Sequence, residues 1–122
     1  MILIGDKNIS YARIEKINSI EDIKNTTPNA IVLFDFDLDI LKYTQANDIK
    51  SAVVVKSIKE VIYASNLDSF YIIPSNNILM QTQKIANNYM FDSKILAVIN
   101  NDEELEQMAL EEIDGVIYKG IL

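Results

Sequence analysis

The stretch AVVVKSIKEVIYASNLDSFYII, residues 52–73, decides the fold of this chain. It consists of an apolar run at residues 52–55, a polar break at Lys56 and Ser57, an amphipathic stretch at residues 58–67 and a second apolar run at 70–73. Runs that are apolar throughout are typical of strands buried on both faces, and such strands alternate with short helices in parallel sheets. The stretch therefore predicts a strand–helix–strand unit of a parallel α/β sheet.

The same unit recurs along the chain. We expect strands at residues 30–35, 51–55, 70–73, 95–99 and 116–118, and helices at residues 20–25, 39–47, 58–67, 78–90 and 105–113. The longest helix carries an apolar stripe made of Ile78, Leu79, Ile85, Ala86, Tyr89 and Met90. Residues 2–4 and 10–17 are two further strand candidates, and the turn-rich residues 5–8 between them could close a hairpin.

These elements predict one α/β domain over residues 1–122. We expect three layers, with a mostly parallel sheet of five or six strands and helices on both faces, flavodoxin-like in outline. Half of a βα barrel is the alternative architecture. In either fold Val53, Val55, Ile72, Val98 and Ile117 are expected in the core, because each lies within an apolar strand.

Composition excludes several classes of function. With 18 acidic and 11 basic residues the chain has a net charge of −7, which disfavours binding to nucleic acids and to anionic membrane surfaces. The chain has no cysteine, which excludes disulfides and thiolate metal sites and suits the cytoplasm. No apolar stretch approaches the roughly 18 residues of a membrane-spanning helix, so we expect no membrane segment.

The absence of histidine removes imidazole catalysis and histidine metal ligands, so any general acid or base must be Asp, Glu, Lys or Tyr. The chain has only three glycines, which are too scattered for a glycine-rich phosphate loop. Three polar residues precede helices and are followed three positions later by an acid, a pattern typical of helix caps. These pairs are Ser19 with Asp22, Ser57 with Glu60, and Asn101 with Glu104.

Parallel α/β sheets bind ligands beyond the carboxyl ends of their strands. The predicted strands bring the following candidates to this edge: Asp35, Asp37, Lys56, Ser57, Ser75, Asn76, Asn100, Asn101 and Lys119. Two carboxylates near a lysine could hold Mg²⁺ and a phosphate, because the ion prefers oxygen ligands and the ammonium offsets oxyanion charge. The competing interpretation is that Asp37 or Asp39 caps the next helix and that the lysines are solvated.

Residues 31–37, IVLFDFD, resemble the first motif of haloacid-dehalogenase-type phosphotransferases. That resemblance implies a nucleophilic Asp35 and an acid/base Asp37. The same segment, with Lys56 and Ser57 beyond the next strand, also resembles a response-regulator receiver, which implies that an aspartate at the strand end accepts phosphate.

Residues 95–118 resemble the last βαβ unit of glycerophosphodiester phosphodiesterase barrels. The catalytic histidines of that family have no counterpart here, so the resemblance implies barrel-like geometry rather than activity. It implies a half-barrel whose exposed edge pairs with a second copy. We expect Gly115 of the Asp114–Gly115 pair to adopt the left-handed turn that ends the preceding helix.

Two functions follow from these observations. The leading hypothesis is a non-enzymatic ligand- or protein-binding or regulatory domain without a cofactor, forming a homodimer, because the usual catalytic residues are missing. The alternative is an Mg²⁺-dependent phosphoryl-transfer or phosphate-ester enzyme. In that enzyme Asp35 and Asp37 would be catalytic and bind the metal, and Lys56 or Lys119 would steady the phosphate.

Overall fold

The computed structural model describes residues 1–122. Its strands are β1 (Ile2–Ile4), β2 (Ile14–Lys16), β3 (Ile31–Asp35), β4 (Ser51–Val55), β5 (Tyr71–Pro74), β6 (Lys94–Ile99) and β7 (Gly115–Tyr118). Its α-helices are α1 (Ile20–Ile23), α2 (Leu38–Ala46), α3 (Ile58–Asn66), α4 (Leu79–Asn88) and α5 (Asp102–Leu110). Two 3₁₀ helices are η1 (Asn76–Ile78) and η2 (Lys119–Ile121). No helix has the length and apolar character needed to cross a membrane.

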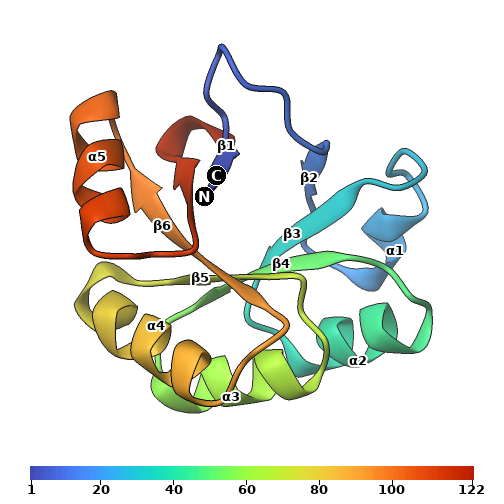
Figure 1. Cartoon of the computed structure of the whole chain (residues 1–122). Helices are drawn as coiled ribbons and strands as arrows, with labels where there is room; N and C mark the ends of the chain where they lie inside the picture. Colours follow the sequence, from blue (N-terminus) through green and yellow to red (C-terminus); the bar gives the residue numbers. More distant parts are fainter.

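All seven strands form one parallel sheet in the order β1-β7-β6-β5-β4-β3-β2. From β2 to β7 each strand lies beside the next strand in sequence, and β1 then joins the far side of β7. The order is therefore that of a ring with one gap, between β1 and β2. Figure 1 shows the sheet curving in this way, with the loop from β1 passing over the gap to β2.

The predicted α/β class and parallel sheet are confirmed, with seven strands instead of five or six. Of the two architectures considered, the half-barrel has the observed strand order. The hairpin at residues 2–17 is wrong, because β1 pairs with β7 and β2 pairs with β3 at opposite ends of the sheet. Both terminal strands run parallel to their neighbours, which a hairpin turn cannot achieve.

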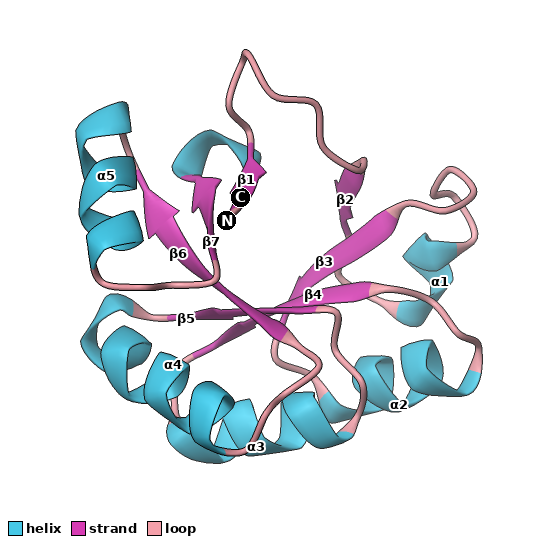
Figure 2. Ribbon diagram, in the orientation of Figure 1, coloured by secondary structure: helices cyan, strands magenta, loops and turns pink.

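The larger part of the core lies between the outer face of the sheet and the helices. Val32, Val53 and Ile72 on the strands pack there with Val61 of α3 and Ala86 of α4. Side chains of all five α-helices contact this cluster. In Figure 2 the helices accordingly follow the outside of the curved sheet.

A second core cluster fills the inside of the curve, where Ile31, Leu33, Ile73 and Leu96 meet. No residue of an α-helix belongs to it. Ile121 of η2 and the terminal Leu122 pack against it and form the third layer of the domain. The strands are thus apolar on both faces, as their sequences predict, although the two faces are covered by different kinds of structure.

The expected core residues Val53, Val55, Ile72 and Ile117 are completely buried, which confirms the register of these strands. Val98 is the exception and is only half-buried. It packs against the inner cluster, as does the half-buried Val54. Other residues of the inner cluster, such as Ile73, Leu96 and Ile117, are at most 1% exposed, so the partial exposure is specific to these two positions.

Helix starts follow the predicted caps with one exception. The Ser57 hydroxyl and the Asn101 amide oxygen accept hydrogen bonds from the backbone N–H groups of Glu60 and Glu104, at 3.2 and 3.1 Å. Asp37 caps α2 by accepting from Ile40 N–H at 3.1 Å. The side chain of Ser19, in contrast, forms no cap hydrogen bond.

Helices α2 to α5 all end in the same way. The residues that follow them, Asp48, Asp68, Met90 and Glu112, have positive φ angles of 51–62°. At each end the next residue's N–H bonds to the carbonyl five positions earlier, as Ile113 N–H does to Met108, which is a Schellman motif. Glu112 therefore ends α5, and the prediction that Gly115 does so is wrong, because Gly115 is the first residue of β7.

Candidate functional site

The carboxyl edge of the sheet holds all the predicted site residues. Each of the strands β3 to β7 ends at this edge, because the strands are parallel, and each contributes at least one candidate residue. In sheet order they run from Lys119 after β7, through Asn100 after β6, Ser75 after β5 and Lys56 after β4, to Asp35 at the end of β3. The candidates therefore form a row along the rim.

Local structure already uses four of these side chains. Asp37, Ser57 and Asn101 cap helices, as described above. The Ser75 hydroxyl donates a hydrogen bond to Oδ1 of Asn77 at 2.7 Å. These side chains satisfy polar groups of their own loops, which is a sufficient structural role.

The remaining candidates are exposed: Asp35, Lys56, Asn76, Asn100 and Lys119. None of them is joined to another by an ion pair, since Arg13–Glu15 is the one ion pair of the structure. No three carboxylates lie close enough together to hold a metal ion. The two aspartates differ in their contacts: the Asp37 carboxylate accepts a hydrogen bond at the start of α2, whereas the Asp35 carboxylate forms no hydrogen bond. The magnesium enzyme remains a hypothesis that rests on Asp35 alone.

One polar cluster at this rim does assemble, and sequence reasoning missed it. The Tyr118 hydroxyl at the end of β7 donates to Oδ1 of Asp102 at 2.6 Å and lies 3.4 Å from Oδ2 of Asp6, which follows β1. The hydrogen bond to Asp102 raises the pKa of Tyr118 to about 12, and burial and the two negative charges act in the same direction. The phenol therefore stays protonated at neutral pH. Its contacts connect the end of β7 to the start of α5 and to the loop that follows β1.

The opposite, amino edge of the sheet holds a ladder of buried serines. The Ser93 hydroxyl donates to the Ser69 carbonyl at 2.5 Å, and the Ser69 hydroxyl donates to the Tyr71 carbonyl at 2.7 Å. The hydroxyls of Ser51 and Ser69 lie 3.4 Å apart. These bonds fix the starts of β4, β5 and β6 relative to one another.

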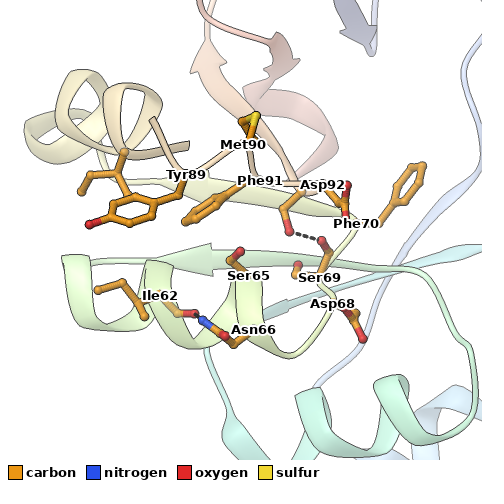
Figure 3. Close-up of a pocket in the computed structure, with 12 residues that line it drawn as sticks. Ile62, Ser65, Asn66, Asp68, Ser69, Phe70, Tyr89, Met90, Phe91 and Asp92 are labelled. Carbon is orange, nitrogen blue, oxygen red and sulfur yellow. Dashed lines mark hydrogen bonds between the residues drawn. The ribbon is translucent and has the colours of Figure 1, made fainter. Parts of the chain in front are cut away.

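A cavity lies beside this ladder, at the opposite edge of the sheet from the predicted site residues. It is a groove of about 850 Å³ between the carboxyl ends of α3 and α4 and the turns that lead into β5 and β6. Figure 3 shows the two helix ends facing each other across it. The lining residues are Ile62, Ser65, Asn66, Asp68, Ser69, Phe70, Ile85, Tyr89, Met90, Phe91, Asp92 and Ser93. We call this cavity the α3/α4 groove.

Large apolar side chains are exposed around the α3/α4 groove. Tyr89 and Met90 are 76% and 84% exposed, and Ile62 and Phe70 are 45% and 37% exposed. The sequence placed Tyr89 and Met90 on the buried stripe of the longest helix, which is wrong because α4 ends at Asn88. Exposed apolar side chains that gather around a groove are typical of binding surfaces.

The charged lining of the α3/α4 groove is acidic. Asp68 and Asp92 are both exposed, and neither lysine nor arginine lines the groove. Asp68 accepts a hydrogen bond from Nε2 of Gln45 at 2.9 Å. Lys50 lies against one lining residue, with its Nζ 4.6 Å from the ring centre of Phe70. The groove thus combines an apolar wall with two carboxylates.

Comparison with known proteins does not assign the chain: no protein-family model matches it, and no curated protein matches it. The three family resemblances seen in the sequence therefore remain predictions. Two surfaces of the structure bear on function, the carboxyl edge and the α3/α4 groove.

Proposed function

We propose that this chain is a non-enzymatic protein-binding domain and that its binding surface is the α3/α4 groove. The proposed occupant is a segment of a partner protein with apolar side chains and flanking basic residues. The observation that carries the proposal is the exposure of Tyr89 and Met90 at the mouth of an 850 Å³ groove.

The apolar wall supplies the binding energy in this proposal. Burying apolar surface contributes about 25 cal/mol per Å², so covering a Tyr and a Met side chain yields several kcal/mol before the cost of association. Met90 has a flexible side chain that adjusts to different partners, and Tyr89 is a residue type enriched among interface anchors. Both residues directly follow α4 and line the groove.

The acidic lining defines the chemistry of the partner. Asp68 and Asp92 would attract lysine or arginine, and the net charge of −7 adds a long-range field of the same sign. An acidic partner would meet repulsion at the groove. A segment with apolar anchors and basic flanks therefore fits best.

The carboxyl edge gives less support to catalysis. Its best-placed polar side chains, Asp37, Ser57 and Asn101, are engaged as helix caps, and its free lysines are solvated. A binding role does not require these polar side chains to converge on one site. We also propose a cytoplasmic location, which a chain without cysteine suits.

The proposal is tested with two labelled amphipathic peptides that share their apolar residues and differ in their flanks, lysine in one and glutamate in the other. We expect saturable binding of the lysine peptide by fluorescence anisotropy and much weaker binding of the glutamate peptide. Met90→Ala and Tyr89→Ala should each weaken binding about tenfold, since buried anchors dominate interface energies.

Leu110→Ala is the matched control, because Leu110 is 80% exposed at the end of α5 and does not line the groove. It should leave the affinity unchanged. Equal binding of both peptides, or equal loss in Leu110→Ala and Met90→Ala, would contradict the proposal.

A further inference from the structure

The gap in the sheet leaves two strand edges without a neighbour, those of β1 and β2. The edge of β2 is the more exposed one, because every residue from 7 to 13 that leads into it is exposed. The sequence predicts a strand over residues 10–17, whereas β2 covers only Ile14–Lys16. Residues 10–12 have a strand-like sequence but no partner strand, because β3 begins at Ile31, opposite Ile14.

The hydrogen bonds of β2 show which backbone groups are free. Ile31 N–H bonds to the Arg13 carbonyl at 2.8 Å, and Ile17 N–H bonds to the Leu33 carbonyl at 2.9 Å. Backbone groups alternate in direction along a strand, so the backbone N–H and C=O groups of Arg13, Glu15 and Ile17 point toward β3. The backbone groups of Ile14 and Lys16 consequently point outward, as free donors and acceptors for another strand.

We propose that a second copy of this chain binds this edge, with two β2 strands pairing antiparallel about a two-fold axis at Ile14. Centring the pair on Ile14 places the outward groups of each Ile14 opposite each other. It also places each Arg13 opposite the partner's Glu15, where cross-strand side chains approach most closely.

The charges select this register over its neighbours. Centring the pair one residue earlier would bring two arginines together at Arg13, and one residue later would bring two glutamates together at Glu15. Like charges directly opposite each other destabilise a strand pair, and opposite charges stabilise it. The edge is also less acidic than the rest of the chain, since residues 10–17 carry two basic side chains and one acidic side chain.

The side chains at this edge are suited to the pairing. Arg13 is 69% exposed, and its Nε lies 3.5 Å from Oε2 of Glu15 in its own chain, so it can turn to a second carboxylate. Tyr11 and Ile9, at 41% and 48% exposure, precede it and would extend the contact. None of these residues lines the α3/α4 groove, so dimerisation and partner binding are independent.

The first test measures mass by sedimentation equilibrium at tens of micromolar. We expect a dimer for the wild type and about tenfold weaker association for Arg13→Glu. In this variant the glutamate at position 13 of each copy faces Glu15 of the other copy, so like charges oppose each other. Lys42→Glu is the matched control, because it makes the same charge change at an exposed site on α2. A monomeric wild type, or equal association of the two variants, would overturn the proposal.

The second test restores the pairing by mixing. Glu15→Arg alone should also lose association, but mixed with Arg13→Glu it should form a heterodimer, since every cross-strand pair is then of opposite charge. Glu15 also holds Thr27, with its Oε2 accepting from the Thr27 N–H and hydroxyl at 2.8 and 2.7 Å, so melting curves must show that the variant folds.

If Glu15→Arg does not fold, a cysteine replaces the mixing test. The chain has no cysteine, so Ile14→Cys carries a single thiol, and the proposed axis sets the two Cα atoms about 5.5 Å apart, within disulfide range. We expect a covalent dimer on mild oxidation, and none for Ile62→Cys in the groove. Equal cross-linking of the two variants, or none for Ile14→Cys, would overturn the proposal.

Discussion

Gly115 lies directly against Ile2, its partner in the pairing of β7 with β1. A Cβ atom at Gly115 would stand 2.5 Å from Cβ of Ile2 and 2.7 Å from its carbonyl oxygen. The same Cβ atom would stand 2.8 Å from Cδ2 of Leu96 on β6. Gly115 is therefore required for the close approach of β1, β7 and β6, and not for a helix end.

We expect Gly115→Ala to destabilise the domain by about 1–3 kcal/mol or more, because backbone as well as side chains would have to move. Gly120→Ala is the control, since a Cβ there meets nothing within 4 Å. Denaturant unfolding of both variants checks this. Equal midpoints for the two would contradict the packing of β1 on β7.

The cost of truncating strand residues should follow the burial of each side chain. Val53→Ala and Ile72→Ala should cost about 1–4 kcal/mol, because both residues are completely buried and leave cavities. Val98→Ala should cost clearly less, since Val98 is half-buried on the inner face. Urea melts of the three variants measure the difference. Similar losses at all three sites would show that Val98 is packed as tightly as the two completely buried residues.

Tyr118 should make stability fall in alkaline solution. In the folded protein the phenol keeps its proton up to its pKa of about 12, whereas in the unfolded chain it loses it at about pH 10. The folded state therefore binds more protons in this window, so the free energy of unfolding decreases as pH rises from about 10 to 12. This contribution is complete below pH 10 and is absent in Tyr118→Phe.

Ultraviolet titration of the phenols checks the cause of this shift. Asp102→Asn should lower the pKa of Tyr118, because the amide still accepts a hydrogen bond but carries no charge. The titration step near pH 12 should disappear in Tyr118→Phe. A step that survives in Tyr118→Phe would assign the raised pKa to another tyrosine.

Mg²⁺ separates the binding domain from the phosphoryl-transfer enzyme. An ion that binds only the folded state raises the melting temperature, and a site built on Asp35 would lose this effect in Asp35→Asn. We expect no shift beyond that of matched ionic strength, because Asp37 is engaged at the start of α2. A saturable shift that disappears in Asp35→Asn would favour the enzyme.

The sequence alone determined the strands, most of the helices and most of the caps. The apolar runs of β3 to β7 and the Ser57–Glu60 and Asn101–Glu104 caps are formed by residues close together in the chain, so a local pattern is enough to predict them. Tyr89 and Met90 show where that pattern fails, because periodicity continues past the residue at which the backbone leaves the helix.

Only the tertiary structure decided how these elements close and what they expose. The pairing of β1 with β7, the role of Gly115 and the contact of Tyr118 with Asp6 join residues that are 112 or 113 positions apart, and no local pattern encodes such contacts. The α3/α4 groove and the free edge of β2 arise in the same way. Each is a surface left over when distant segments pack, and its existence depends on which strands become neighbours.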